Sequence, residues 1–417
     1  MHRRTFLLST FGLTVAARLP AMAEVPNILG ATAITRVYGA GQRLVGVAIA
    51  QDRPVADAAL DPSLYSVDGR TITRVYAASA PGIADPAGSW ITLDLSPEDA
   101  GAALIISDGR RTTRRPASVT VTITPKAAGA PQGGPPDFNT IPRSIPTDAA
   151  MDPVVDGFEQ AIFDDPATGR WLAYNLYVPK GATGPLPLVL FLHDAGNTSP
   201  VVDTTLVQGL GAVSWASAED QARHPAIVLA PQYAEQTVDD ASATSVLLET
   251  TLNLVEQIAS SHPVDRGRIY TTGQSGGGML SIAMMIRKPD LFAAGFLVAC
   301  QWDSAVVAPL ARQKLWVVVA EGDAKAFPGQ NAIMEVIAAE GTAYSRAVWD
   351  GRLTDFTAPL AAQAALGRTV NYTVLQQGTV VPAGQQDTPA ANHINTWRIA
   401  YDIPGLRDWI MAQRKAG

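Results

Sequence analysis

The sequence lacks the residues that several common classes of site require. Its 417 residues include one cysteine, Cys300, and five histidines. A single cysteine cannot form an internal disulfide, and the apolar residues that precede Cys300 favour a buried structural thiol. No His-x-x-x-His or Cys-x-x-Cys spacing occurs. The sequence therefore predicts no metal site and no bound cofactor.

Positive charge and long apolar runs are also scarce. The chain has 31 lysines and arginines against 38 acidic residues, and its net charge at pH 7 is −7. An acidic protein is a poor ligand for phosphate backbones, so no nucleic-acid partner is expected. Beyond the first residues no apolar run is long enough to cross a bilayer. We therefore expect no stable membrane insertion of the mature chain.

The first 23 residues have the pattern of an export signal. Arg3 and Arg4 are followed by an apolar run over residues 6–17 and by Ala-Met-Ala at 21–23, a small-x-small cleavage site. The paired arginines resemble a twin-arginine signal; the alternative is an ordinary secretory signal. Both predict an exported protein, periplasmic or secreted. Removal of residues 1–23 deletes three arginines and no acidic residue, which changes the net charge from −7 to −10.

The rest of the sequence divides into three regions. Residues 24–125 contain short β-prone runs separated by turn residues, a pattern typical of a small β-sandwich. Residues 126–150 are rich in proline and glycine and are predicted to be a linker; a segment draped over a domain surface is the alternative. In residues 151–417, apolar strand-like runs without alternation are interleaved with helical segments. This pattern predicts an α/β domain with a mainly parallel sheet covered on both faces.

A Gly-x-Ser-x-Gly motif follows one of these runs. Residues 268–272 lead into Gly273, Gln274, Ser275 and, after one further glycine, Gly277, and a helix-like segment comes next. In a nucleophile elbow the serine occupies a strained turn between strand and helix, and the glycines leave room for it. A plain glycine-rich turn is the alternative. The strand before the motif and the helix after it favour Ser275 as the nucleophile.

The general base is predicted by the order of the histidines. His393 alone lies downstream of Ser275; His2 falls in the export signal, and His224 and His262 precede prolines upstream of the serine. In folds that place a serine nucleophile on such a turn after a strand, the triad follows the order Ser, Asp, His. Chain order therefore predicts His393 as the base of a catalytic triad.

The acid of the triad is expected just after a late strand. Residues 315–320 form an apolar run that ends in Glu321, Gly322 and Asp323. Asp323 is the predicted acid, and a turn or helix-capping role is its alternative. Glu321 is the rival acid. Asp350 and Asp355 are weaker candidates because neither follows so clear a strand.

A second strand end supplies a candidate oxyanion hole. Residues 188–192 run into His193, Asp194 and Ala195, where small residues can present backbone amides to a substrate oxygen. We predict that the amide of Asp194 or Ala195, together with that of Gly276, stabilises the oxyanion, and that His193 is structural. The expected chemistry is acyl transfer from an ester to water.

The chain resembles the α/β-hydrolase serine esterases grouped as predicted peptidases, which are related to feruloyl, acetylxylan and polyhydroxybutyrate esterases. The resemblance covers residues 155–415 and rests on four segments: Phe-Leu-His-Asp-Ala-Gly at 191–196, Leu-Ala-Pro-Gln at 229–232, residues 268–278, and Asn-His-Ile-Asn-Thr-Trp at 392–397. Some members carry an immunoglobulin-like domain in front, which residues 24–125 resemble more loosely. The resemblance implies an α/β-hydrolase fold behind an immunoglobulin-like sandwich.

The sequence departs from these relatives at two positions. They often have His-Gly where this chain has His193 and Asp194, and often His-Gly-x-x-Asp where it has Glu321, Gly322 and Asp323. The first difference leaves the loop amides usable. The second leaves the choice between Asp323 and another acid open.

The leading hypothesis is an exported serine carboxylesterase that acts on a small-molecule or polymer-borne ester. A serine peptidase would use the same triad, and a feruloyl, acetylxylan or polyhydroxyalkanoate esterase is a narrower alternative. A third hypothesis is a binding protein whose β domain attaches to polysaccharide. That domain has few aromatic residues for stacking on sugars, so we expect it instead to shape the active-site cleft. Acyl and alcohol specificity and oligomeric state are not predicted.

Overall fold

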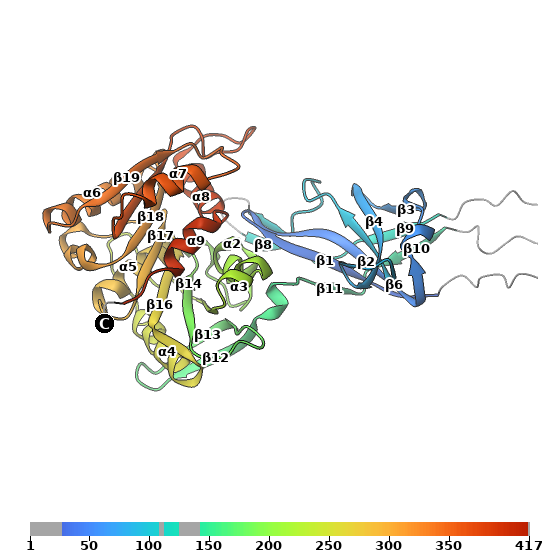
Figure 1. Ribbon diagram of the computed structural model, residues 1–417, viewed down its shortest axis with the longest axis horizontal. Helices are drawn as coiled ribbons and strands as arrows, with labels where there is room; N and C mark the ends of the chain where they lie inside the picture. Colours follow the sequence, from blue (N-terminus) through green and yellow to red (C-terminus); the bar gives the residue numbers. More distant parts are fainter. Residues whose placement is uncertain (1–26, 108–111, 125–141, 416–417) are drawn as a thin grey trace, which may run out of the picture.

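The computed structural model describes residues 27–107, 112–124 and 142–415, and all structural statements concern these residues. The predicted export signal, residues 1–23, lies outside them. Figure 1 shows two domains that follow one another along the long axis, a β domain and a larger α/β domain.

The N-terminal domain is a sandwich of two main sheets. The larger sheet has the order β11-β1-β2-β6-β4-β5 and the smaller one β10-β9-β3, while β7 pairs with β8. Residues from both main sheets, including Val47, Leu93 and Val121, form one hydrophobic core. The strands are β1 (Ile28–Tyr38), β2 (Gly41–Ala56), β3 (Tyr65–Val67), β4 (Ile72–Ala80), β5 (Ile83–Ala84), β6 (Ala87–Leu95), β7 (Ile105–Ser107), β8 (Thr112–Arg114), β9 (Thr120–Ile123), β10 (Arg143–Pro146) and β11 (Ala149–Met151).

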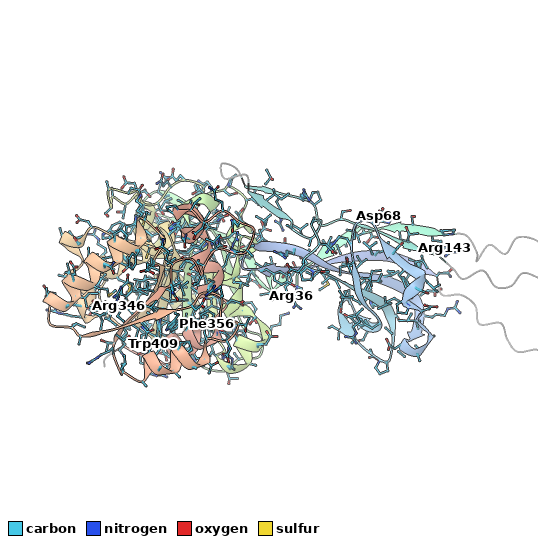
Figure 2. The ribbon with its side chains drawn as sticks, turned by 90° about the horizontal axis from the view of Figure 1, so that it is seen from above. Arg36, Asp68, Arg143, Arg346, Phe356 and Trp409 are labelled. Atoms are coloured by element: carbon cyan, nitrogen blue, oxygen red, sulfur yellow. The ribbon has the colours of Figure 1, made fainter. Side chains whose placement is uncertain are left out.

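Part of the predicted linker belongs to this sandwich. Of residues 126–150, the structure describes 142–150, and these contain β10 and most of β11. β10 pairs with β9, and β11 pairs in parallel with β1. Figure 2 shows Arg143 of β10 at the far end of the β domain. The linker prediction is wrong for this part, because local proline content does not reveal pairing with distant strands.

The C-terminal domain is built on a nine-stranded sheet of order β12-β13-β15-β14-β16-β17-β18-β20-β19. β12, β13 and β15 pair antiparallel, and the remaining pairs are parallel. The strands are β12 (Glu159–Asp165), β13 (Arg170–Tyr177), β14 (Leu186–Leu192), β15 (Ile227–Gln232), β16 (Val264–Gln274), β17 (Ala294–Val298), β18 (Leu315–Ala320), β19 (Tyr344–Trp349) and β20 (Val370–Leu375).

Helices cover both faces of this sheet. They are α1 (Thr204–Val207), α2 (Leu210–Val213), α3 (Ala218–Arg223), α4 (Leu247–Ser261), α5 (Gly276–Arg287), α6 (Ala326–Ala339), α7 (Thr357–Ala364), α8 (Pro389–Ala400) and α9 (Pro404–Met411). Buried residues of α4, α5 and α6 pack on one face, and those of α2, α8 and α9 on the other. Strand β14 shows why the sequence lacks alternation: Leu188 and Leu190 enter the first core, whereas Val189 and Phe191 enter the second.

The two domains meet at the hairpin end of β1 and β2, which points toward α2 in Figure 1. Val37 of β1 is buried in the same core as α2, α8 and α9. Gly39 lies so close to α8 that a β-carbon there would be 3.1 Å from the carbonyl oxygen of Arg398. Arg114 of β8 also donates a 2.6 Å hydrogen bond to Asp203, just before α1. The β domain is therefore packed on the segments around α1 and α8.

Replacement of Val37 by aspartate tests this junction. Because Val37 is only 6% exposed and packs in an apolar core, Val37→Asp should lower the free energy of unfolding by about 2–4 kcal/mol. Urea unfolding followed by tryptophan fluorescence measures the change. Arg36→Asp is the control, because Arg36 is exposed at the same strand end. Equal stability of the two variants would contradict the packing at Val37.

Candidate active site

Three chemically active side chains follow strands of the nine-stranded sheet. Ser275 lies between β16 and α5, and Asp323 comes three residues after β18. His393 lies within α8, in the segment that follows β20. Because β16, β18 and β20 are parallel members of one sheet, their carboxyl ends share an edge. This is the edge where ligand sites of such sheets form.

The three residues form one hydrogen-bonded chain. His393 Nε2 is 2.8 Å from Ser275 Oγ, and His393 Nδ1 is 2.5 Å from Asp323 Oδ2. The carboxylate of Asp323 accepts a hydrogen bond from the Nδ1–H group of His393. The neutral imidazole therefore has a free lone pair at Nε2, which can accept a hydrogen bond from the serine hydroxyl. The side chain of His393 is 27% exposed and that of Asp323 only 3%. The arrangement is that of an activated serine nucleophile.

Backbone strain raises Ser275 above the sheet. Its φ is +50°, a conformation that non-glycine residues rarely adopt. The neighbouring glycines are required by space: a β-carbon at Gly273 would lie 2.4 Å from the carbonyl carbon of Gly277, and one at Gly277 would lie 2.0 Å from Leu192 O. The Gly-x-Ser-x-Gly motif therefore has the geometry of a nucleophile elbow.

The environment of Asp323 keeps it ionised. Burial raises the pKa of Asp323, but hydrogen bonds from His393 and from the amides of Lys325 and Ala326 more than offset this effect and leave the pKa below its ordinary value. A permanently charged carboxylate stabilises the imidazolium that forms when His393 takes a proton.

The rival acids make contacts elsewhere. Glu321 accepts a hydrogen bond from the amide of Gln377. Asp350 is paired with Arg352, and Asp355 accepts from the amide of Thr357 at the start of α7. Of the four acids considered from the sequence, the structure places Asp323 against the histidine.

His193 is buried beneath the loop that follows β14. Its Nε2 accepts a 3.0 Å hydrogen bond from the amide of Tyr233, which leaves Nδ1 to donate to the carbonyl of Asp194 at 2.8 Å. Burial lowers the pKa of His193, so the ring is neutral. These contacts place His193 in a structural position between two loops.

The loop amides predicted for the oxyanion hole lie beside the elbow. A β-carbon at Gly276 would be 3.3 Å from Ala195 N, so the backbone of Ala195 faces the first residue of α5. Ala195 is also exposed. Asp194 instead contributes its carbonyl to His193 and its carboxylate to polar groups behind the loop. Of the two amides expected to partner that of Gly276, the structure brings the one of Ala195 to it.

A small cavity adjoins the oxyanion side of the site. It is lined by His193, Asp194, Ala195, Thr198, Tyr233, Glu235, Gln236, Thr237, Val238 and Gly276. The centre of a water-sized sphere can occupy only about 10 Å³ of it, which is room for about one water molecule. Val238 closes it near the elbow, since a β-carbon at Gly276 would be 3.6 Å from Val238 Cγ2.

The segment that carries Val238 is held in place by several contacts. Val238 and Thr244 form an isolated antiparallel bridge, and the carboxylate of Asp239 accepts hydrogen bonds from two amides of the intervening turn. Asp240 forms an ion pair with Lys325, two residues after Asp323. The wall of the cavity is therefore tied to the acid loop of the triad.

Two groups of the site were not singled out from the sequence. Gln208 and Asn197 form hydrogen bonds with Gln274 and Asp194 respectively. Gln208 directly follows α1 and lies outside the quoted motifs, and no sequence signal marks it.

In the described part of the chain no cluster of three or more histidine, cysteine or acidic side chains could hold a metal ion. No described helix is long and apolar enough to cross a membrane.

Comparison with known proteins agrees with the two-domain architecture. Residues 30–133 match the family described as "Esterase Ig-like N-terminal domain". A solved structure described as a thermostable esterase is similar over 93% of this chain and 100% of its own, with a TM-score of 0.77 and 24% sequence identity. The chain has an α/β-hydrolase fold preceded by an immunoglobulin-like domain. The fold predicted from the sequence is thus confirmed, as is the resemblance to esterases with such a front domain.

Other solved structures match a smaller share of the chain. The feruloyl esterase module from Clostridium thermocellum, in complex with sinapinate, covers 59% of this chain and 87% of its own at 12% identity, with a TM-score of 0.40. An acetyl xylan esterase from Aspergillus awamori covers 43% and 80% at 16% identity, with a TM-score of 0.34. No curated protein matches the sequence.

A fluorophosphonate reagent tests whether the triad is assembled as the geometry indicates. We expect it to label Ser275, because His393 removes the hydroxyl proton during attack. Asp323→Asn should slow labelling by about 1,000-fold or more, because the tautomer of His393 is no longer imposed. Since the pKa of Asp323 is below its ordinary value, the carboxylate is ionised at every pH above about 4, and titration of Asp323 itself should not change the wild-type labelling rate between pH 5 and pH 8.

Glu321→Gln is the control for this measurement and should change the labelling rate less than three-fold. Mass spectrometry of the labelled peptide identifies the modified serine. A larger defect in Glu321→Gln than in Asp323→Asn would assign the acid to Glu321 instead.

Proposed function

We propose that this protein is an exported serine carboxylesterase that uses Ser275, His393 and Asp323 and passes through an acyl-enzyme intermediate. The single observation that supports this proposal best is the continuous hydrogen-bonded chain from Ser275 Oγ through the imidazole of His393 to Asp323. Export rests on the signal pattern of residues 1–23. The esterase assignment is in keeping with the front domain, which matches a domain family of esterases.

In the proposed reaction, His393 takes the proton of Ser275 as its oxygen attacks the ester carbonyl. The bond between the carbonyl carbon and the alkoxy oxygen breaks, and the imidazolium gives its proton to the leaving alcohol. Water then attacks the acyl-enzyme, with His393 as base, and releases the carboxylic acid. The backbone of Ala195 lies beside Gly276; their two amides are proposed to stabilise the oxyanion, and each should then lower the barrier by roughly 3 kcal/mol.

The size of the cavity supports a short acyl group. The leaving alcohol must lie toward His393, because that residue protonates it, and the carbonyl oxygen must face the oxyanion amides. We place the acyl substituent in the cavity that adjoins those amides. This cavity beside Ala195 and Gly276 admits about one water-sized group. An acetyl methyl is close to that size, whereas a feruloyl group or the acyl side of a peptide is much larger. We therefore favour acetyl and similar short esters over feruloyl esters and peptides.

Hydrolysis of p-nitrophenyl acetate by the mature protein tests the proposal. Wild type should turn over, and Ser275→Ala of equal folded content should lose at least about 10,000-fold in kcat, because the nucleophile is absent. Ser304→Ala, outside the three strand ends that carry the triad, is the control. Peptide cleavage without ester turnover would favour the serine peptidase instead, and equal activity of wild type and Ser275→Ala would exclude the proposed nucleophile.

Val238→Ala tests the proposed acyl limit. Loss of two methyl groups beside the elbow should raise kcat/KM for the butyrate ester relative to the acetate ester by about ten-fold, because each methylene accommodated contributes on the order of 1 kcal/mol or more. Val246→Ala is the matched control, since Val246 follows in the same connection but is 42% exposed. An unchanged acetate-to-butyrate ratio in Val238→Ala would show that Val238 does not limit the acyl group.

A further inference from the structure

Four polar side chains behind the oxyanion loop form a closed ring of hydrogen bonds. Gln274 Nε2 donates to Asp194 Oδ2 at 2.9 Å and to Gln208 Oε1 at 3.0 Å. Asn197 Nδ2 donates to the same two oxygens, at 2.7 Å and 2.9 Å. Each amide nitrogen has two hydrogens, and each is used once. The ring thus contains two donors and two acceptors in alternation.

This ring joins the two segments that supply the oxyanion amides. Asp194 precedes Ala195 directly, and Gln274 precedes Gly276 by two residues across the elbow. Asp194 also fixes its own loop, because Oδ1 accepts from the amide of Gly196 at 2.9 Å. A shift of either segment would stretch hydrogen bonds of the ring. The ring therefore keeps the distance between the amides of Ala195 and Gly276 constant.

Three of the four ring residues are buried, and one of these three is oriented at a cost. Asp194 is 7% exposed, Gln208 8% and Gln274 1%. Within the described residues the Nε2 of Gln208 is buried without a hydrogen-bond partner, which is unfavourable by about 1–3 kcal/mol. The opposite orientation of this amide would direct its donor at the two donors of the ring. The two hydrogen bonds to Oε1 therefore determine how Gln208 lies.

We propose that Asp194 is a positioning residue of this enzyme, whose carboxylate holds the amides of Ala195 and Gly276 in register through the ring. The inference rests on the proposed esterase function and adds to it the group that preorganises the oxyanion hole. Preorganisation matters because donors aimed in advance at the developing charge need no rearrangement during the reaction. Asp194 acts through the loop, and its carboxylate does not touch the substrate.

A carboxylate is needed at this position because both of its oxygens accept. In Asp194→Asn, either the new NH₂ group faces the donors Gln274 Nε2 and Asn197 Nδ2, or it faces the amide of Gly196. One donor then meets another in each orientation. Gln274→Glu should be defective as well, because it places a second carboxylate beside Asp194.

The double variant Asp194→Asn/Gln274→Glu should restore the ring in reverse. In wild type the Nε2 of Gln208 has no partner. In the double variant this side-chain amide turns over, and its NH₂ group and that of Asn at 194 become the donors. Glu at 274 and the oxygen of Asn197 become the acceptors. The charge of the site is unchanged, and the oxygen of Asn at 194 still accepts from Gly196. A role of Asp194 in packing alone would not be rescued by this exchange.

The experiment measures kcat and KM for p-nitrophenyl acetate in wild type, both single variants and the double variant. We expect each single variant to lose about 10- to 100-fold in kcat with KM changed less than three-fold, because the defect lies in transition-state stabilisation. The double variant should recover at least half of the loss on a logarithmic scale. Asp165→Asn is the matched control: Asp165 is also buried and accepts from an asparagine side chain and a backbone amide, but far from the elbow.

A second readout separates this inference from the proposed function. The phosphoryl oxygen of a fluorophosphonate occupies the same oxyanion hole, so its labelling rate at Ser275 should follow the same order among the variants, even if simple esters are poor substrates. Single variants that are folded, as judged by circular dichroism, and that keep wild-type kcat and labelling would overturn the role of Asp194. Defective singles without recovery in a folded double variant would overturn the ring. Absence of labelling in wild type would overturn both proposals.

Discussion

The active site depends on the close contact between the start of α5 and the end of β14. At Gly277 the backbone of the helix approaches Leu192 O so closely that any side chain would collide. This contact forces Ser275 into its strained conformation and brings the first amide of α5 next to Ala195. The nucleophile, the helix N-terminus and the oxyanion loop are thus assembled by one backbone approach that only glycine permits.

Two buried carboxylates organise the polar groups around this contact. Asp323 accepts from His393 and from two amides of its own loop, and Asp194 accepts from Gln274, Asn197 and Gly196. Each oxygen of both groups has at least one donor, which is what makes a buried negative charge tolerable. We propose that the first carboxylate orients the base and that the second orients the amides.

The front domain and the turn around Val238 contact the surroundings of the site from outside the sheet. Val37 enters the core shared by α2 and α8, and α8 carries His393. The β domain thus packs against the same helix that carries the proposed catalytic base. The turn around Val238 is tied through Asp240 to Lys325, beside the acid of the triad. Val238 is one wall of the small cavity, and the size of that cavity is the basis for expecting short acyl groups.

Local patterns in the sequence determined much of the fold and part of the site. The elbow was recognisable because its strand, serine, glycines and helix are contiguous, and His393 because chain order leaves one candidate. Uniform apolar runs such as that of β14 predicted a sheet buried on both faces. The pairing of β10 and β11 with distant strands was missed, because proline and glycine content describes local preference only.

Tertiary structure alone decided the contacts between segments that are remote in the chain. Glu321 and Asp323 both follow the same strand, and their contacts distinguish them: Glu321 accepts from the amide of Gln377, whereas Asp323 meets His393. Gln208 is a second example, because it accepts a hydrogen bond from Gln274, which lies 66 residues away in the chain. Such partners are set by the packing of whole elements rather than by local preference. The sequence by itself therefore determined which residues could react, and the folded chain decided which of them meet.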